Sequence, residues 1–277
     1  AYEIMPSLVG SEMCIRDSFM AWNIGANDTA NSLGTAVGSG VLSLRGALIR
    51  IAIFDFLGAV LFGTWVTKTI GKGIVDTSAL PASTACMGAL AALGAASIWL
   101  TIATWKGLPV STTHSIVGGM LGFGIISVTA GSTIHWGVMG KIALSWVTSP
   151  VCGAILSFLL FFLVSKFIIQ RADVHRAEKV FAYLQVATAM YVGFSFGSND
   201  VANAVGPIYL ALSSAGAGIP IHPYTLLIIG ACGIIVGAFT WGYRVIVTVG
   251  KKITEINPVR GFCAEFATAT VILVASY

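Results

Sequence analysis

One polar heptapeptide occurs twice within apolar sequence, and this repetition limits the folds open to the chain more than any other feature. The sequence GANDTAN occupies residues 25–31, and GSNDVAN occupies residues 197–203, so equivalent positions lie 172 residues apart. Each copy places two amides and a carboxylate among apolar neighbours, which is costly unless these groups are paired or bind a ligand. Two copies of one costly cluster indicate two halves of a single site.

The apolar sequence around the heptapeptides is typical of an integral membrane protein. Hydrophobic residues make up 56% of the chain and charged residues only 9%, against roughly 25% charged residues in soluble domains. Several apolar runs reach the length of about 20 residues that a helix needs to cross a bilayer. Because lipid offers no partners to backbone polar groups, we expect these runs to be helices. The composition excludes an ordinary soluble domain and predicts an all-α, polytopic membrane bundle.

Charge divides the chain into four segments. Residues 1–18 carry Glu12, Arg16 and Asp17 where apolar sequence is expected, and we interpret them as an atypical stretch of foreign origin. Residues 19–165 form a first membrane repeat and residues 181–277 a second, incomplete one. Between them, residues 166–180 hold a sustained run of Lys and Arg, which predicts a cytoplasmic loop. The predicted spans are about 19–37, 50–69, 81–104, 116–130, 136–168, 181 into the second heptapeptide, 223–249 and 259–277.

The duplication extends beyond the heptapeptides. Residues 62–74 align with residues 241–253 at an offset of 179, and Pro81 and Cys86 align with Pro258 and Cys263 at an offset of 177. Loop insertions account for such small changes of offset. Duplicated membrane units underlie many secondary transporters, whose binding sites lie where the two halves meet.

The second half stops short of one feature of the first. A counterpart of Ser111, at the heptapeptide offset, would fall six residues past Tyr277. We therefore expect the chain to be truncated at its carboxyl end, and residues 1–18 suggest the same for the amino end.

The heptapeptides carry the chemistry of a cation site. Glycine and alanine permit close backbone approach and a helix break, and a bound cation can satisfy the carbonyl groups that a break frees. Hard oxygen ligands without thiol or imidazole suit Na⁺ better than a transition metal. The alternative is that the polar residues hold neighbouring helices together, but a carboxylate inside each membrane segment favours function. The predicted cation ligands are Asn27, Asp28, Asn31, Asn199, Asp200 and Asn203, with Asn27 and Asn199 also expected to contact substrate.

A second motif, PVSTTHS at residues 109–115, has the pattern of a helix start. Proline followed by Ser and Thr is capping chemistry. The amino end of a helix presents free N–H groups and a positive dipole end, and the hydroxyls of Ser111, Thr112 and Thr113 would add to this cradle for an oxyanion. The alternative is an ordinary capped helix. His114 could carry a proton or support the anion, or could simply pack through hydrogen bonds.

Two isolated acids lie within apolar runs, Asp55 in 51–63 and Glu265 in 261–274. Either could hold a cation, take a proton, or pair with a base such as Arg50 or Lys251. The five cysteines have no metal-ligand spacing and are expected to be small buried apolar residues. Nucleophile, nucleotide and zinc motifs are absent from the sequence, so neither an enzyme nor a nucleic-acid-binding protein is predicted.

The heptapeptides together with GLPVSTTHS at residues 107–115 resemble the inorganic phosphate transporter family, which includes sodium-phosphate symporters and bacterial low-affinity phosphate carriers. The resemblance covers residues 22–277. It implies an all-helical carrier with two inverted repeats and discontinuous helices, which moves phosphate with Na⁺ or H⁺ by alternating access. The family's Asn-Asp motifs would fall on Asn27, Asp28, Asn199 and Asp200, its Ser-Thr-Thr motif on Ser111, Thr112 and Thr113, and its membrane acids on Asp55 and Glu265.

These observations predict a multi-pass protein of the plasma (inner) membrane with phosphate, Na⁺ or H⁺, and lipid as its partners, and with no cofactor. A sulfate carrier of the same architecture and an anion channel stay open as alternatives, as does a homo-oligomer.

Overall fold

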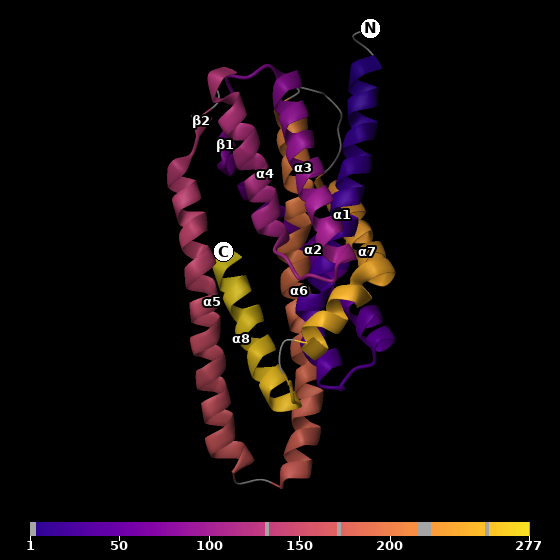
Figure 1. Cartoon of the computed structure of the whole chain (residues 1–277), viewed down its shortest axis with the longest axis vertical. Helices are drawn as coiled ribbons and strands as arrows, with labels where there is room; N and C mark the ends of the chain where they lie inside the picture. Colours follow the sequence, from indigo (N-terminus) through magenta and orange to yellow (C-terminus); the bar gives the residue numbers. More distant parts are fainter. Residues whose placement is uncertain (1–3, 131–132, 171–172, 215–222, 253–254, 277) are drawn as a thin grey trace.

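The chain folds into a bundle of long helices whose backbone hydrogen bonds are closed within each helix, as a membrane interior requires (Figure 1). The computed structural model describes residues 4–130, 133–170, 173–214, 223–252 and 255–276. The elements are α1 (Ile4–Gly38), α2 (Leu44–Gly73), β1 (Val75–Asp76), α3 (Ala82–Trp105), α4 (Thr112–Ser127), the 3₁₀ turn η1 (Val128–Ala130), β2 (Thr133–Ile134), α5 (Trp136–Val164), the π-helical turn η2 (Ser165–Ile169), α6 (Val174–Ser214), α7 (Pro223–Lys252) and α8 (Pro258–Ser276).

Six of the described helices contain spans that are long and apolar enough to cross a membrane. These spans are Leu44–Thr64, Ser83–Trp105, Trp136–Ile169, His175–Gly206, Tyr224–Gly250 and Pro258–Ala275. Helix α4 has 16 residues, about 24 Å of helix, which is shorter than a hydrocarbon core of about 30 Å. The prediction of an all-α, multi-pass membrane protein is confirmed.

Capping side chains mark where several helices begin. The hydroxyl of Ser43 accepts a hydrogen bond from the Gly46 amide at the start of α2. The carboxylate of Asp173 accepts one from the His175 amide at 2.9 Å, and α6 begins there. Such caps satisfy amide groups that have no partner inside the helix.

The first half of the chain pairs with the second through two equivalent helix contacts. Helix α1 packs along α7, and α2 packs along α6. A Cβ atom on Gly25 of α1 would lie 1.8 Å from the Ile234 carbonyl oxygen of α7, and one on Gly197 of α6 would lie 2.0 Å from the Asp55 carbonyl oxygen of α2. Gly25 and Gly197 are heptapeptide equivalents, and Asp55 and Ile234 are related by the 179 offset. The duplicated sequence therefore makes the same backbone contact twice.

A further pair of contacts repeats this relation one turn away. A Cβ atom on Gly58 would lie 2.1 Å from the Phe194 carbonyl oxygen, and one on Gly237 would lie 1.9 Å from the Trp22 carbonyl oxygen. Figure 1 shows α1 and α6 running in opposite directions. The inverted relation of the complete repeats stays a prediction.

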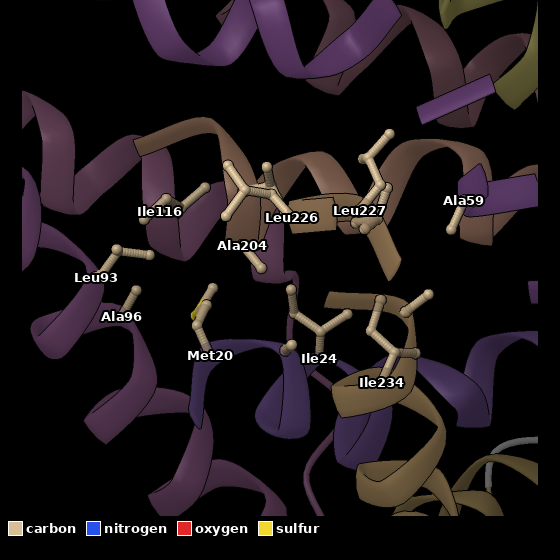
Figure 2. Close-up of a cluster of buried hydrophobic side chains, with 14 of the residues drawn as sticks. Met20, Ile24, Ala59, Leu93, Ala96, Ile116, Ala204, Leu226, Leu227 and Ile234 are labelled. Carbon is tan, nitrogen blue, oxygen red and sulfur yellow. The ribbon is translucent and has the colours of Figure 1, made fainter. Parts of the chain in front are cut away.

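The main apolar core lies where α1, α3, α6 and α7 meet (Figure 2). Met20 and Ile24 of α1 face Leu93 of α3 and Ile234 of α7, and Ala204 of α6 lies among them. These side chains are at least 96% buried. The core therefore lies next to both heptapeptides and holds their helices together.

The structure differs from two details of the predicted fold. The helix break expected in each heptapeptide is wrong, because α1 runs unbroken through residues 25–31 and α6 through 197–203. Their glycines serve close packing between helices, which needs no break. The discontinuity lies instead between α3 and α4, whose connection turns at mid-height in the bundle (Figure 1).

The charged segment 166–180 is also more helical than predicted. The π-helical turn η2 covers residues up to Ile169, and α6 begins at Val174, so only residues 170–173 separate the two helices. Lys166 lies near the end of the span Trp136–Ile169, and Arg176, Glu178 and Lys179 lie near the start of the span His175–Gly206. Helix α1 likewise includes residues 4–18. The foreign origin of residues 1–18 and the cytoplasmic side of segment 166–180 stay predictions.

Candidate functional site

The candidate site is built around the connection between α3 and α4, residues 106–111, which we call the tip. Gly107 has a φ of 67°, in the left-handed region that glycine adopts without strain. Its amide donates to the Thr104 carbonyl at 2.9 Å, and the Leu108 amide donates to the Ala103 carbonyl at 2.9 Å. This pair of bonds is a Schellman motif, which ends α3 and redirects the chain toward α4.

The start of α4 presents hydrogen-bond donors, as the sequence predicts. Ser111 is the N-cap, and its hydroxyl accepts a hydrogen bond from the His114 amide at 3.2 Å. The amides of Thr112 and Thr113 precede the first position that has an intrahelical acceptor. The first turn can therefore offer two amides, and the hydroxyls of the same residues, to an anion.

Asn27 fixes the tip to α1. Its Nδ2 donates to the Thr104 hydroxyl at 2.9 Å and to the Leu108 carbonyl at 3.0 Å, and its Oδ1 accepts from the Val110 amide at 3.0 Å. Asn27 is fully buried and lines neither of the pockets described below. The side-chain amide of Asn27 is thus occupied by hydrogen bonds to the protein, and its role as a ligand stays a prediction.

A pocket of about 300 Å³, which we call the cradle pocket, lies against the start of α4. Asp28 on α1 and Asp200 on α6, the aspartates of the two heptapeptides, both line this pocket. The other lining residues are Asn31, Pro109, Val110, Ser111, Thr112, Thr113 and Phe196. The structure thus brings residues of both heptapeptides and of the Ser-Thr-Thr motif to one pocket. Their roles as ligands stay predictions.

Hydrogen bonds tie the first turn of α4 to both heptapeptides. The Thr112 hydroxyl donates to the carboxylate of Asp28, and Nδ2 of Asn203 donates to the Thr113 hydroxyl at 3.1 Å. Oδ1 of Asn203 is buried without a partner among the described residues. Nδ2 of Asn31 lies 3.5 Å from the Asp28 carboxylate. The first turn of α4 is therefore connected directly to the carboxylate of Asp28 and to the amide of Asn203.

A second, smaller pocket of about 10 Å³, which we call the inner pocket, lies beside the first and shares Asp28, Phe196 and Asp200 with it. Asp55 on α2 joins the site here, and its Oδ1 and the Oγ1 of Thr29 are buried without hydrogen-bond partners in the described part of the chain. The volume suits about one water molecule. Buried oxygens without protein partners are places where a water molecule or an ion can bind, and oxygen ligands suit a hard cation. The remaining lining residues are Ile24, Ser32, Gly197 and Ile234.

The carboxylates alone do not form a metal centre. Among the described residues, no three His, Cys, Asp or Glu side chains cluster closely enough to hold a metal ion. A cation in the inner pocket would depend on hydroxyl and backbone oxygens as well. This donor set suits Na⁺ and not a transition metal.

Besides Asn27 and Asn203, three more of the predicted residues line neither pocket. Asn199 lines neither pocket. The His114 ring is exposed and meets the Trp146 ring edge-on at 4.0 Å between centroids. Glu265 on α8 is buried and accepts hydrogen bonds from Thr35, from Thr188 at 2.6 Å and from Gln185 at 3.3 Å.

The suggested pairing of an acid with a base is not seen in the described contacts. Arg50 donates instead to the Gly46 carbonyl at 2.9 Å, and the side chain of Lys251 lies outside the described residues. The partners of Glu265 are neutral donors, so cation binding and proton uptake stay open for this acid.

Sequence reasoning missed the hydroxyls of the inner pocket and the partners of Glu265. Thr29 lies inside the first heptapeptide and Ser32 follows it directly, but a hydroxyl on a helix often bonds to its own backbone, so the sequence gives no sign of their direction. Gln185 carries a usable signal, because an uncharged polar side chain in a membrane helix needs a partner.

Comparison with known proteins gives a consistent answer. The sequence profile described as "Phosphate transporter family" matches residues 24–277. A Pyrococcus furiosus protein named as a phosphate permease is 38% identical over 93% of this chain and 80% of its own length. The chloroplastic inorganic phosphate transporter 2-1 of Arabidopsis thaliana is 35% identical over 93% of this chain and 60% of its own.

A solved structure shares the fold as well as the sequence. The structure described as the sodium-dependent phosphate transporter superposes with a TM-score of 0.88 at 37% identity, over 97% of this chain and 84% of that one. The heptapeptides, the start of α4 and the pockets between them all lie inside the matched region. The chain belongs to the phosphate transporter family.

Proposed function

We propose that this chain carries inorganic phosphate across a membrane together with Na⁺, by alternating access, and that it is not an enzyme. The observation that carries the proposal is the presence of two carboxylates and an anion-binding helix start in one pocket. Asp28 and Asp200 line the cradle pocket beside Thr112 and Thr113. An anion would be repelled there unless cations neutralise the carboxylates first.

This charge arrangement supplies a physical reason for coupling. A cation in the inner pocket would touch Asp28 and Asp200 on one side, while the same carboxylates face the cradle pocket on the other. Binding of the cation therefore favours binding of the anion, and by linkage the anion favours the cation. The donor set and the printed name of the matched structure both support Na⁺ over H⁺.

The same carboxylates favour phosphate over sulfate. Near neutral pH phosphate retains at least one O–H group, which can donate to a carboxylate, whereas sulfate offers only acceptors. Sites that bond a ligand hydroxyl reject analogues without it strongly. Asp28 accepts a hydrogen bond from Thr112 at the edge of the pocket, and its carboxylate has further acceptor positions for a phosphate hydroxyl.

The test is uptake of radiolabelled phosphate into proteoliposomes that contain the purified chain. An inward Na⁺ gradient should drive saturable uptake, and replacing Na⁺ with choline at constant ionic strength should remove it. Sulfate should compete at least about a hundredfold less well than unlabelled phosphate. Equal competition by sulfate would refute the substrate assignment.

The anion channel makes a different prediction in the same vesicles. Channel flux needs no Na⁺ gradient and follows the membrane potential, so it would persist in choline when a potential is imposed with valinomycin. A proton-coupled carrier would respond to a pH gradient in choline. Loss of uptake under both conditions supports Na⁺ coupling.

A further inference from the structure

We propose that Arg244 on α7 is a positioning residue for the phosphate cradle, and that it acts by clamping the end of α3 so that the tip holds the start of α4 in place. This inference rests on the proposed function, since it assigns a role within the same site. Arg244 lines neither pocket, so it would act through the tip and not by touching the anion.

Arg244 is an arginine inside a candidate membrane span, Tyr224–Gly250. An ionisable residue at such a place is costly and needs a defined partner. Its Nη1 donates to the Trp105 carbonyl at 3.1 Å. Its guanidinium also lies 4.9 Å from the ring centroid of Trp241 and 5.8 Å from that of Tyr243, within the range of cation–π attraction.

The Trp105 carbonyl is one of the acceptors at the end of α3 that the Schellman motif does not use. The last turn of α3 uses the carbonyls of Ile102, Ala103 and Thr104 for the amides of residues 106–108. Trp105 comes next, and its carbonyl faces Arg244. A cation at the carboxyl end of a helix is also favoured by the helix dipole. Arg244 thus completes the end of α3 with both a hydrogen bond and a charge.

The tip is held from two sides by these contacts. Asn27 fixes it to α1 through Leu108 and Val110. On the other side Gly107 approaches α7 closely, because a Cβ atom there would lie 3.3 Å from the Arg244 carbonyl oxygen and 3.3 Å from the Thr248 hydroxyl. The chain continues from this clamp directly to Ser111, the N-cap of α4.

The aromatic contacts place Arg244 within the α1–α7 pair. The Trp241 ring meets the Trp22 ring at 5.1 Å between centroids. The Trp22 indole donates to the Thr240 hydroxyl at 2.8 Å. Thr240 therefore belongs to the same helix interface, and it offers a matched control because its hydrogen bonds are to Trp22, Val236 and Gly237 and not to the tip.

The substitution Arg244→Lys distinguishes a positioning role of Arg244 from electrostatic attraction of phosphate at a distance. Arg244→Lys keeps the positive charge but loses the planar group that stacks on Trp241 while bonding to the carbonyl. If Arg244 acts by attracting phosphate at a distance, the lysine variant should bind as wild type does. If it acts by clamping the tip, lysine should fail nearly as fully as Arg244→Met.

The first measurement is equilibrium binding of radiolabelled phosphate to the purified chain at saturating Na⁺. We expect Arg244→Lys and Arg244→Met each to weaken binding about tenfold, as loss of about one hydrogen bond of typical strength would. Thr240→Val should stay within about twofold of wild type. Wild-type affinity in Arg244→Lys would overturn the proposal, and so would an equal loss in Thr240→Val.

The second measurement reports the tip directly and needs no substrate. Leu108 is half exposed, so Leu108→Cys, in a background with the native cysteines replaced by alanine, gives a thiol on the tip. Its labelling by a soluble maleimide should be several-fold faster in the Arg244→Lys background than with Arg244 present. Equal labelling rates would refute the clamp. If the wild-type chain bound no phosphate, the proposed function would be refuted. The labelling rates would still show whether Arg244 holds the tip in place.

Discussion

Thr112 on α4 donates its hydroxyl hydrogen to the carboxylate of Asp28 on α1. This bond joins the first turn of α4, the proposed anion cradle, to the first heptapeptide. Because Asp28 also lines the inner pocket, one carboxylate faces both the proposed cation and the proposed anion. Asp200 occupies the equivalent place in the second heptapeptide and lines the same two pockets.

Neutralising either carboxylate should abolish coupled transport. Asp28→Asn and Asp200→Asn each remove a negative charge from both pockets while nearly keeping side-chain volume. We expect Na⁺-driven phosphate uptake to fall at least a hundredfold in each, because the cation loses its charged ligand. Asp173→Asn is the matched control, since Asp173 caps α6 at the exposed end of the bundle and asparagine caps equally well. Wild-type uptake in either site variant would contradict the assignment.

The substitution Asn27→Asp distinguishes two possible roles of Asn27, holding the tip in place and binding the cation. If the residue fastens the tip, the aspartate keeps the acceptor for Val110 but loses the donors to Thr104 and Leu108. Phosphate binding should then weaken about tenfold to a hundredfold, at about 0.5–1.5 kcal/mol for each lost hydrogen bond. If Asn27 is a cation ligand, a carboxylate should keep or strengthen Na⁺ binding. Calorimetric titration with Na⁺ and with phosphate distinguishes the two outcomes.

Much of this site could be predicted from the residues alone. Two amide-carboxylate clusters at a fixed offset indicated a shared site, and the pattern of Pro109 followed by Ser111 indicated a helix start. Both follow from local chemistry: a buried carboxylate needs a partner and a helix start needs a cap. The structure brings Asp28, Asp200 and Thr112 to one pocket.

The parts that could not be predicted depend on tertiary contacts. In a sequence, a glycine that breaks a helix looks the same as a glycine that lets two helices pack closely. At Gly25 and Gly197 the structure shows close packing. Asn27 looks equivalent to Asn199 by position, but only the structure shows that its amide is occupied by the tip. The direction of the Thr29 hydroxyl has no signature in the sequence at all.

The equivalent glycines should be equally intolerant of a methyl group. Gly25→Ala and Gly197→Ala would each place a Cβ atom about 2 Å from a backbone carbonyl oxygen of the partner helix. A backbone atom cannot move aside as a flexible side chain can, so the whole partner helix would have to shift. We expect each to lower the free energy of unfolding by about 3 kcal/mol or more. Gly118→Ala is the control, because a Cβ atom there meets open space.

Thermal unfolding of the purified variants in detergent would check this prediction. Gly25→Ala and Gly197→Ala should lower the melting temperature by similar amounts, since the two glycines make the same contact in the two repeats. Gly118→Ala should melt with wild type, apart from a small gain from the better helix propensity of alanine. A melting temperature of Gly25→Ala equal to that of wild type would show that α1 and α7 can move apart at little cost in free energy.

Thr29→Val should stabilise the protein and weaken its cation site at the same time. The Thr29 hydroxyl is buried, lines the inner pocket and has no hydrogen-bond partner among the described residues. Leaving such a group unpaired costs about 1–3 kcal/mol, so valine, which has nearly the same shape, should raise the melting temperature in Na⁺-free choline buffer. If the hydroxyl is a Na⁺ ligand, the variant should need several-fold more Na⁺ for half-maximal phosphate binding. Its stability advantage should also disappear at saturating Na⁺, because wild type gains more from binding. A raised melting temperature with an unchanged Na⁺ requirement would mean that Thr29 faces the pocket without binding the cation.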